Sequence, residues 1–358
     1  MAHLVMSRSF WSGRRVFLTG HSGFKGGWLA LCLREMGAEV YGYSLAPDTA
    51  PSLYDSARLA ECVSGEFADI RDADRLLRSV AAFRPEVVLH LAAQPLVRES
   101  YRSPAQTYAT NVTGTLNLLE AVRQCDTVRA VLVVTSDKCY ENREWQWPYR
   151  EQDALGGHDP YSSSKACVEL LCASWRESFL RERGVALATA RAGNVIGGGD
   201  WSADRLLPDI LRAWEAGESV ILRYPDAVRP WQHVLDPLHG YLLLAQALIE
   251  RGQDVAEAWN FGPDSSGTAT VGELVHAMAQ LWPGEAGWSV EARVQPHEAG
   301  LLTLDSSRAR QSLGWRPKWG LKQSLRHTLE WHHAWRDGQD MQQYCRTQIA
   351  AHEGEFND

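Results

Sequence analysis

Long hydrophobic segments are absent from this sequence. No apolar run approaches the roughly 18–20 residues that a membrane-spanning helix needs. The first ten residues, Met1–Phe10, also lack the apolar block of a secretory signal peptide. We therefore expect a cytoplasmic protein that does not bind a membrane.

Basic residues are also fewer than acidic residues. The chain of 358 residues has 36 Lys and Arg against 44 Asp and Glu, which gives a formal net charge of −8. Proteins that bind nucleic acids or anionic membranes carry basic stripes instead. The charge balance therefore argues against both kinds of partner.

Cysteine motifs are missing as well. The sequence has no Cys-x-x-Cys pair and no Cys/His cluster with the spacing of a zinc site. Its seven cysteines are an odd number, scattered from position 32 to position 345. This usage is typical of free thiols in a reducing cytosol, and it predicts no metal site.

Strand and helix patterns do alternate through the first half of the chain, which predicts a parallel sheet covered by helices. Val87–Leu91 and Ala130–Thr135 are nearly continuous apolar runs, as expected of central strands that are buried on both faces. The other predicted strands of this half are Arg15–Thr19, Glu39–Tyr43, Cys62–Phe67 and Ala186–Ala190, and the predicted helices are Phe24–Met36, Asp72–Phe83, Pro104–Arg123 and Tyr161–Arg183.

The strict alternation ends after Asn194, where glycines and prolines interrupt it. The expected fold class is α/β, with a Rossmann-type doubly wound parallel sheet in residues 1–193. Residues 194–358 are expected to form a smaller mixed α/β substrate domain whose chain crosses back to the first. Its predicted elements are the helices Pro237–Glu250, Val271–Leu281 and Leu321–Trp335 and the strand Ala258–Phe261.

A glycine-rich turn follows the first predicted strand and opens the first predicted helix. Its glycines lie three residues apart and allow a tight turn with close approach of the backbone to a pyrophosphate. The N–H groups of the helix start then face the phosphates. Such turns also occur without a ligand, but this position favours a dinucleotide site. The site includes Gly20, Ser22, Gly23, Phe24, Lys25 and Gly26.

The second predicted strand, Glu39–Tyr43, ends without the carboxylate that holds the adenosine ribose in many NAD enzymes. Ser44 offers only a neutral hydroxyl there, and no arginine is near to meet a 2′-phosphate, so the sequence favours NAD over NADP. Asp69 and Ile70, after the third predicted strand, are candidate adenine contacts. An ordinary helix cap in this segment is the alternative.

Tyr161 and Lys165 lie four residues apart, which places them one turn apart on one helix face. An ammonium beside a phenol favours the phenolate and is expected to lower its pKa from about 10 toward the working range. The phenolate could then accept a proton from a hydroxyl that is being oxidised. Ser136, at the end of the preceding predicted strand, would lie beside them. A surface Tyr/Lys pair is the alternative.

The glycine turn, Ser136 and the Tyr161-x-x-x-Lys165 pair together resemble the extended short-chain dehydrogenase/reductases that modify nucleotide sugars. The resemblance covers essentially the whole chain. It implies NAD as the cofactor, with Tyr161 and Lys165 also touching it. It further implies that Leu91, Ala92 and Ala93 form the turn by the nicotinamide ribose and that Asn111 is the family's helix asparagine.

Asp137-Lys138, directly after Ser136, suggests the subfamily. Nucleotide-sugar 4,6-dehydratases carry an acid/base pair in this place, usually Asp-Glu, and the Asp-Lys form with Phe24-Lys25 resembles the dehydratases that act on CDP-glucose. An exposed turn is the alternative. Residues that resemble the family's substrate contacts are Gln94, Asn194, Asp200, Arg205, Arg229, His233 and Glu298.

The resemblance implies a reaction in three steps: oxidation at C4 of CDP-D-glucose, elimination of water across C5 and C6, and return of the hydride to C6. Tyr161, Ser136 and Lys165 would serve the oxidation. Asp137 would protonate the leaving C6 hydroxyl, while Lys138 would act as the C5 base or only position groups there. The family also implies a homodimer formed by the two helices Pro104–Arg123 and Tyr161–Arg183.

Two other functions stay open at this point. A 4-epimerase on a nucleotide sugar would use the same Tyr/Lys pair, with Asp137-Lys138 incidental, and a dehydratase acting on a different nucleotide sugar is a variant of the first hypothesis. A redox-sensing binding protein on the same fold is the second alternative. Such proteins typically lose the Tyr/Lys pair, which this sequence retains.

Overall fold

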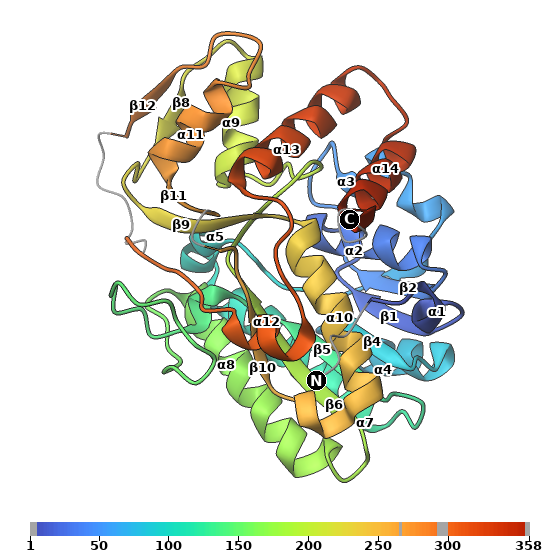
Figure 1. Ribbon diagram of the computed structural model, residues 1–358. Helices are drawn as coiled ribbons and strands as arrows, with labels where there is room; N and C mark the ends of the chain where they lie inside the picture. The colour runs from blue at the N-terminus through green and yellow to red at the C-terminus, as the bar shows by residue number, and fades with distance from the viewer. Residues whose placement is uncertain (1–5, 265–266, 292–299, 355–358) are drawn as a thin grey trace.

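A seven-stranded parallel sheet forms the centre of the computed structural model, which describes residues 6–264, 267–291 and 300–354. The order β10-β6-β5-β4-β1-β2-β3 is that of a doubly wound fold with one added strand at the edge (Figure 1). The strands are β1 (Arg15–Thr19), β2 (Glu39–Ser44), β3 (Ser64–Phe67), β4 (Val87–His90), β5 (Ala130–Val134), β6 (Ala186–Ala192) and β10 (Ala258–Phe261).

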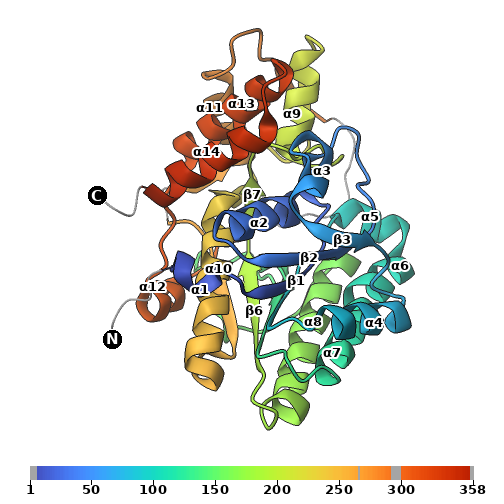
Figure 2. The same ribbon diagram turned by 90° about the vertical axis from the view of Figure 1, so that its right-hand side faces the viewer.

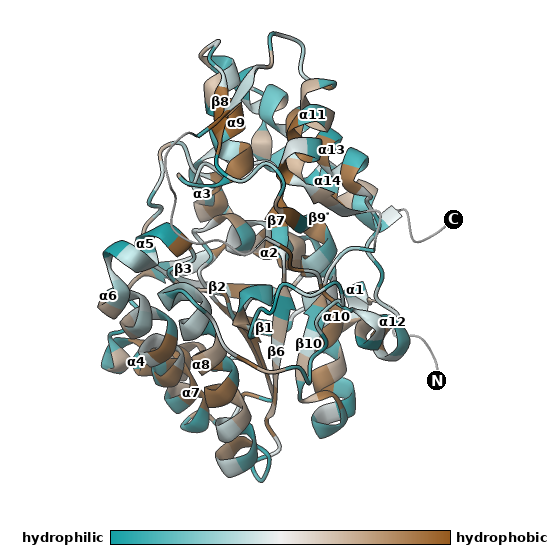
Figure 3. Cartoon of the chain, turned by 90° about the vertical axis from the view of Figure 1, so that its left-hand side faces the viewer, coloured by the Kyte–Doolittle hydropathy of each residue, from teal (hydrophilic) through white to brown (hydrophobic). Residues whose placement is uncertain are grey.

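Helices cover both faces of this sheet, which explains why its central strands are completely buried. All five residues of β5 and all seven of β6 are buried. Figure 2 shows the two helical layers, and Figure 3 shows hydrophobic residues gathered on the strands between them. One layer contains α4 (Ala73–Phe83), α7 (Gly114–Arg123) and α8 (Pro160–Trp175); the other contains α2 (Phe24–Glu35) and α10 (Leu235–Arg251).

A second lobe stands above the carboxyl ends of the strands (Figure 1). It has its own hydrophobic cluster, in which three helices pack against two small sheets. The helices are α9 (Leu206–Glu215), α11 (Val271–Ala279) and α13 (Leu321–Arg336), and the strands are β7 (Asn194–Ile196), β8 (Val220–Leu222), β9 (Val228–His233), β11 (Thr268–Thr270) and β12 (Trp288–Val290).

The chain after residue 194 does not stay in the second lobe. Strand β10 pairs with β6 in the large sheet, and α14 (Met341–Gly354) packs against α2. The sequence patterns predicted β10 but did not predict α9, α14 or α12 (Ser307–Leu313). The remaining short helices are α1 (Arg8–Trp11), α3 (Leu53–Ser56), α5 (Val97–Arg102) and α6 (Pro104–Tyr108).

Candidate active site

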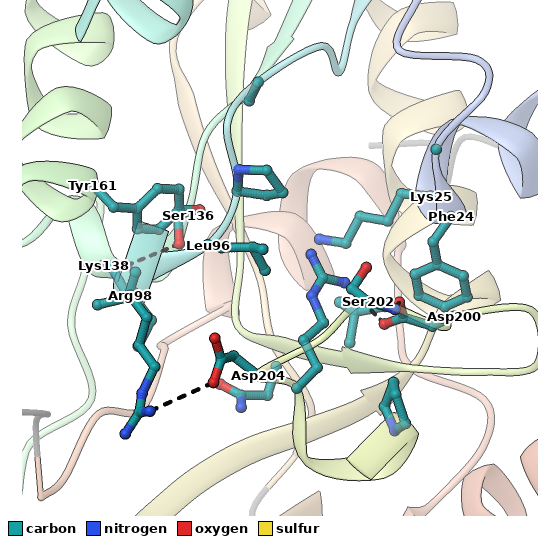
Figure 4. Close-up of a pocket in the computed structure, with 18 of the residues that line it drawn as sticks. Phe24, Lys25, Leu96, Arg98, Ser136, Lys138, Tyr161, Asp200, Ser202 and Asp204 are labelled. Atoms are coloured by element: carbon teal, nitrogen blue, oxygen red, sulfur yellow. Dashed lines mark hydrogen bonds and ion pairs between the residues drawn. The ribbon is translucent and has the colours of Figure 1, made fainter. Parts of the chain in front are cut away.

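A pocket of about 620 Å³ lies between the carboxyl ends of the sheet strands and the second lobe. Its wall includes residues that follow β1, β4 and β5 on one side and residues of α9 and β8 on the other. Open α/β sheets bind their ligands at this edge. Figure 4 shows side chains from both sides converging on the pocket, which we take as the candidate active site.

The glycine turn leaves room for a ligand at the start of α2. Gly20 has a φ of 80°, and a Cβ on it would lie 2.7 Å from the backbone nitrogen of Ala92. A Cβ on Gly26 would collide with the carbonyl of Gly20. Gly23 precedes the helix and provides no side-chain cap, so first-turn N–H groups remain for an anion in the pocket. All six predicted residues line it: Gly20, Ser22, Gly23, Phe24, Lys25 and Gly26.

The end of β2 carries neutral polar groups. The Ser44 hydroxyl lies 2.9 Å from His21 Nδ1 and 2.9 Å from the Ser22 hydroxyl. Burial lowers the pKa of His21 to about 4, so its imidazole is neutral. This part of the wall therefore offers a ribose neutral hydrogen bonds from Ser44 and its neighbours.

Asp69 and Ile70 line the next part of the wall. The helix cap expected as the alternative for this segment is present at Asp72, which accepts a hydrogen bond from the Arg75 N–H, and Asp69 is not part of it. Arg71, in the same predicted segment, also lines the pocket and forms an ion pair with Asp69 at 2.5 Å. The basic group in this region thus already has an acidic partner.

Residues 136–138 form a tight turn after β5. The Ser136 hydroxyl donates to Asp137 Oδ1 at 3.0 Å and accepts from the backbone N–H of Lys138 at 3.2 Å. Asp137 is only 2% exposed, so the alternative of an exposed turn is wrong. Among the described residues its Oδ2 has no hydrogen-bond partner, and a Cβ on Gly193 would come within 3.1 Å of it.

Burial is the main influence on the pKa of Asp137. It raises the pKa of this carboxyl, while the charges of Lys138, Arg229 and Lys25 and the Ser136 hydroxyl act in the opposite direction. A carboxyl group with a raised pKa can hold a proton and deliver it to a leaving group. The turn therefore has the chemistry of a general acid.

Tyr161 and Lys165 are both buried in the wall, one turn apart on α8. Lys165 Nζ donates to the carbonyl oxygen of Val134 at 3.2 Å. Burial raises the pKa of Tyr161 to about 12 and lowers the pKa of Lys165 to about 8. The prediction of a lowered phenol pKa is therefore wrong for the protein chain by itself, because desolvation outweighs the favourable contacts.

A buried ion pair fixes the segment that contains the catalytic turn. Glu169 of α8 and Arg191 of β6 are 2.8 Å apart, with both side chains 3% exposed. Glu169 also accepts from the Thr135 hydroxyl, and Arg191 donates to the Tyr140 hydroxyl at 2.7 Å. The pair thus holds both ends of the segment that carries Ser136–Lys138. Its one sequence signal is the spacing of Glu169 four residues after Lys165.

Two predicted site residues, Asn111 and Gln94, are not among the residues that line the pocket. Asn111 Oδ1 accepts from the Gln94 N–H at 2.8 Å, and its Nδ2 donates to the Gln94 carbonyl and to Ser164 Oγ. Gln94 Nε2 donates to the Thr107 hydroxyl at 2.9 Å. These amides are occupied in fixing the turn after β4, which corrects the prediction that they contact ligands. The turn itself does line the pocket through Leu91, Ala92 and Ala93.

His233 is also not part of the pocket. Its side chain is fully buried, with its ring 4.7 Å from that of Trp319 and 6.4 Å from that of Trp28. Its Nδ1 accepts from the Leu235 N–H, and burial keeps its pKa well below the usual value. The predicted substrate contact is therefore wrong, because aromatic side chains cover the end of β9.

Four other predicted residues do line the far wall: Asn194, Asp200, Arg205 and Arg229. Arg205 forms an ion pair with Asp200 at 2.9 Å, and Arg229 donates to its neighbour's carbonyl oxygen at 2.9 Å. Glu298 lies outside the described residues.

A group of arginines surrounds Asp204, and no sequence motif predicted it. Arg98 and Arg102 on α5 approach its carboxylate at 3.5 and 3.2 Å, and Arg223, just after β8, approaches it at 2.9 Å. Asp204, Arg98 and Arg223 line the pocket, whereas Arg102 does not. The four-residue spacing of Arg98 and Arg102 on one helix face was the available signal.

Within the described ranges, no group of three or more His, Cys, Asp or Glu side chains is arranged to hold a metal ion. No helix in those same ranges is long and apolar enough to cross a membrane. All seven cysteines are free thiols.

Comparisons with known proteins show which family the chain resembles. The family model of GDP-mannose 4,6-dehydratase matches residues 17–328. The chain is 52% identical over 342 residues to the CDP-glucose 4,6-dehydratase of Salmonella typhimurium, which covers 94% of this chain and 95% of that protein. It is 28% identical over 336 residues to a dTDP-glucose 4,6-dehydratase of Xanthomonas campestris, covering 88% of this chain and 92% of that one.

The fold is shared with solved structures. The dTDP-glucose 4,6-dehydratase of Streptomyces venezuelae, solved with NAD bound, has a TM-score of 0.79 and 22% sequence identity, covering 92% of this chain and 99% of that one. The arrangement of the large sheet and the second lobe is therefore an established one.

Proposed function

The chain belongs to the GDP-mannose 4,6-dehydratase family of extended short-chain dehydrogenase/reductases, and from that membership we propose that it dehydrates CDP-D-glucose to CDP-4-dehydro-6-deoxy-D-glucose. One observation carries the proposal. A single pocket brings a Tyr161/Lys165 pair beside Asp137, a buried carboxyl whose pKa is raised by burial. The similarity to the Salmonella enzyme supports CDP-glucose as the substrate.

The pocket fits NAD as the cofactor. The uncapped first turn of α2 after Gly23 suits a diphosphate, and Ser44 and Asp69 lie where the adenosine half would follow. Lys165 and Tyr161 would meet the nicotinamide half. Bound there, NAD would supply the hydride chemistry of the reaction, which is oxidation at C4 and reduction at C6.

Tyr161 serves the oxidation by accepting the proton of the C4 hydroxyl, while Ser136 holds the same oxygen. The proton acceptor is the phenolate form of Tyr161, and because burial raises its pKa to about 12, forming that phenolate needs a positive charge close by. Lys165, one turn away and anchored on the Val134 carbonyl, supplies that charge as long as its amine is protonated.

Asp137 serves the elimination by protonating the leaving C6 hydroxyl. Its Oδ1 is held by Ser136, and its Oδ2, which has no protein partner in the described part of the chain, is left to face the sugar. Lys138 follows Asp137 in the same wall, and we assign it to the C5 position, as the base or as the group that orients a water molecule there.

A substrate panel tests the proposed function. The purified protein is incubated with NAD⁺ and the glucose esters of CDP, dTDP, GDP and UDP, and products are identified by NMR. We expect a 4-keto sugar with a C6 methyl group from CDP-glucose. A product that keeps the C6 hydroxyl and differs only at C4 would indicate a 4-epimerase. Turnover of another nucleotide would correct the substrate.

We also propose a homodimer formed through α6, α7 and α8. Leu170 on α8 is 61% exposed, and Tyr108 and Phe179 nearby are 37% and 41% exposed, which leaves apolar surface outside the two helical layers. An isologous contact would cover it. Sedimentation should give a dimer in the parent protein and a monomer in Leu170→Glu.

We also propose that the protein lies in the cytoplasm, a reducing compartment, because its cysteines are free thiols. Cell fractionation can check this.

A further inference from the structure

One carboxylate, that of Asp204, holds arginines from both sides of the pocket. Arg98 comes from α5, in the part of the chain that builds the large sheet, whereas Arg223 comes from the second lobe. All three side chains are about three-quarters buried, with exposures between 22% and 26%. Figure 4 shows Arg98 reaching from the neighbourhood of Tyr161 and Lys138 to Asp204, so this ion pair borders the space beside the catalytic turn.

The backbone conformation of Asp204 is one that few residue types adopt, and it fixes the position of the carboxylate. Its φ is 63°, in the left-handed region that costs free energy for residues with a side chain and that Asp and Asn tolerate best. The next residue, Arg205, lines the pocket and pairs with Asp200. The chain from Asp200 to Arg205 thus contributes two carboxylates and one arginine to the pocket, and the two other arginines, Arg98 and Arg223, come from elsewhere.

Arginines in a pocket suit a diphosphate. The planar guanidinium donates two parallel hydrogen bonds to phosphate oxygens, and charged bonds of this kind are about twice as strong as neutral ones. A diphosphate is a stronger multiple acceptor than one carboxylate, so it can replace Asp204 as the partner of an arginine. We therefore propose that Arg98 and Arg223 bind the diphosphate of the nucleotide sugar, and that Asp204 is the counterion from which this ligand takes them.

The proposal rests on the proposed function for the identity of the nucleotide but makes its own statement about Asp204. If Asp204 is a counterion in competition with the ligand, removing its charge should strengthen ligand binding. If the Asp204 ion pairs only hold α5 against the second lobe, removing the Asp204 charge should lower both the ligand affinity and the melting temperature. Tighter ligand binding after loss of the Asp204 charge therefore indicates a counterion, and weaker binding indicates a structural role.

Arg102 provides a matched control. It pairs with the same carboxylate from the same helix, but its side chain is 61% exposed and does not line the pocket. Loss of Arg102 removes an ion pair with Asp204 without removing a ligand contact. Surface pairs of this kind contribute little to stability.

The experiment titrates the full-length protein with CDP, UDP, dTDP and GDP by calorimetry, with melting temperatures recorded for each variant. We expect Arg98→Gln and Arg223→Gln each to weaken CDP binding about tenfold, the effect of losing one charged hydrogen-bonding partner. Arg102→Gln should stay within about twofold of the parent. Asp204→Asn, which keeps the shape and the tolerated φ, should bind CDP about threefold to tenfold more tightly.

The gain in Asp204→Asn should vanish in the double variant Arg98→Gln/Asp204→Asn, because the arginine that the change releases is gone. Weaker CDP binding in Asp204→Asn, or equal losses in Arg98→Gln and Arg102→Gln, would overturn the proposal. If the parent protein prefers another nucleoside diphosphate, the proposed substrate is wrong, and the variants are then compared with that ligand. If it binds none of the four, both proposals fail.

Discussion

The two ends of the pocket are built differently. At the sheet end, Tyr161, Lys165 and Asp137 are buried, and desolvation is the main influence on the pKa of each. At the lobe end, Asp204 and its arginines are partly exposed and are matched by opposite charges. Proton transfer needs groups whose pKa differs from that in water, which burial provides. Recognition of a charged ligand needs cations that can exchange partners, which partly exposed ion pairs provide.

The largest expected effect is at the sheet end. Tyr161→Phe removes the proton acceptor and should lower kcat by about 10²–10⁴-fold, the usual contribution of general acid–base catalysis. The fold should be preserved, which the circular dichroism spectrum checks. Turnover within a few-fold of the parent value would remove Tyr161 from the mechanism.

Asp137→Asn should separate oxidation from elimination. The amide cannot deliver a carboxylic proton to the C6 hydroxyl, so dehydration should slow by about 10²-fold or more while oxidation at C4 continues. Rapid quenching followed by mass spectrometry should find a sugar oxidised at C4 that has kept its C6 hydroxyl. Normal dehydration by this variant would support the epimerase-like alternative for the turn.

The ion pair below the catalytic turn should behave unlike the pairs at the surface. Glu169→Gln leaves the Arg191 charge buried without its partner and should cost about 3–5 kcal/mol of unfolding free energy. Glu177→Gln breaks an exposed pair with Arg181 on the following turn and should cost about 0–1 kcal/mol. Urea unfolding measures both; equal costs would contradict the assigned burial.

The two ends should also differ in their response to pH. Burial lowers the pKa of Lys165 to about 8, so its ammonium is present below this pH and is lost above it. The rate should therefore fall as pH rises past about 8, by roughly tenfold per further unit. CDP affinity should change little over the same range, since the arginines remain charged. If the rate and the CDP affinity both fell above pH 8, the proposed difference between the two ends would be contradicted.

The smallest expected effect concerns the cofactor. Ser44 offers the ribose neutral hydrogen bonds in place of a carboxylate, so NAD⁺ should bind roughly tenfold more weakly than with an acidic partner. The purified protein should contain less than one NAD per chain and gain activity when NAD⁺ is added. NADP⁺ should bind more weakly still, because Arg71 is already paired with Asp69. Full occupancy or a preference for NADP⁺ would contradict this.

Much of the sheet end was predictable from short-range patterns. The apolar runs predicted the strands of the large sheet to within about two residues of their observed ends. The glycine turn, Ser136–Lys138 and the Tyr161/Lys165 pair each lie within a few consecutive residues, so their spacing implies their proximity. The lobe end was harder to predict from the sequence. Arg98, Asp204 and Arg223 are far apart in the chain, and each resembles an ordinary surface charge.

The sequence by itself determined which side chains share a turn or a helix face, since backbone geometry converts local spacing into position. Only the tertiary structure decided which of them are buried and which charges they meet. It raised the pKa of Tyr161 where spacing alone predicted the opposite, and it packed His233 among tryptophans. The reason is physical: desolvation and charge pairing depend on segments that are distant in the chain and meet only when it folds.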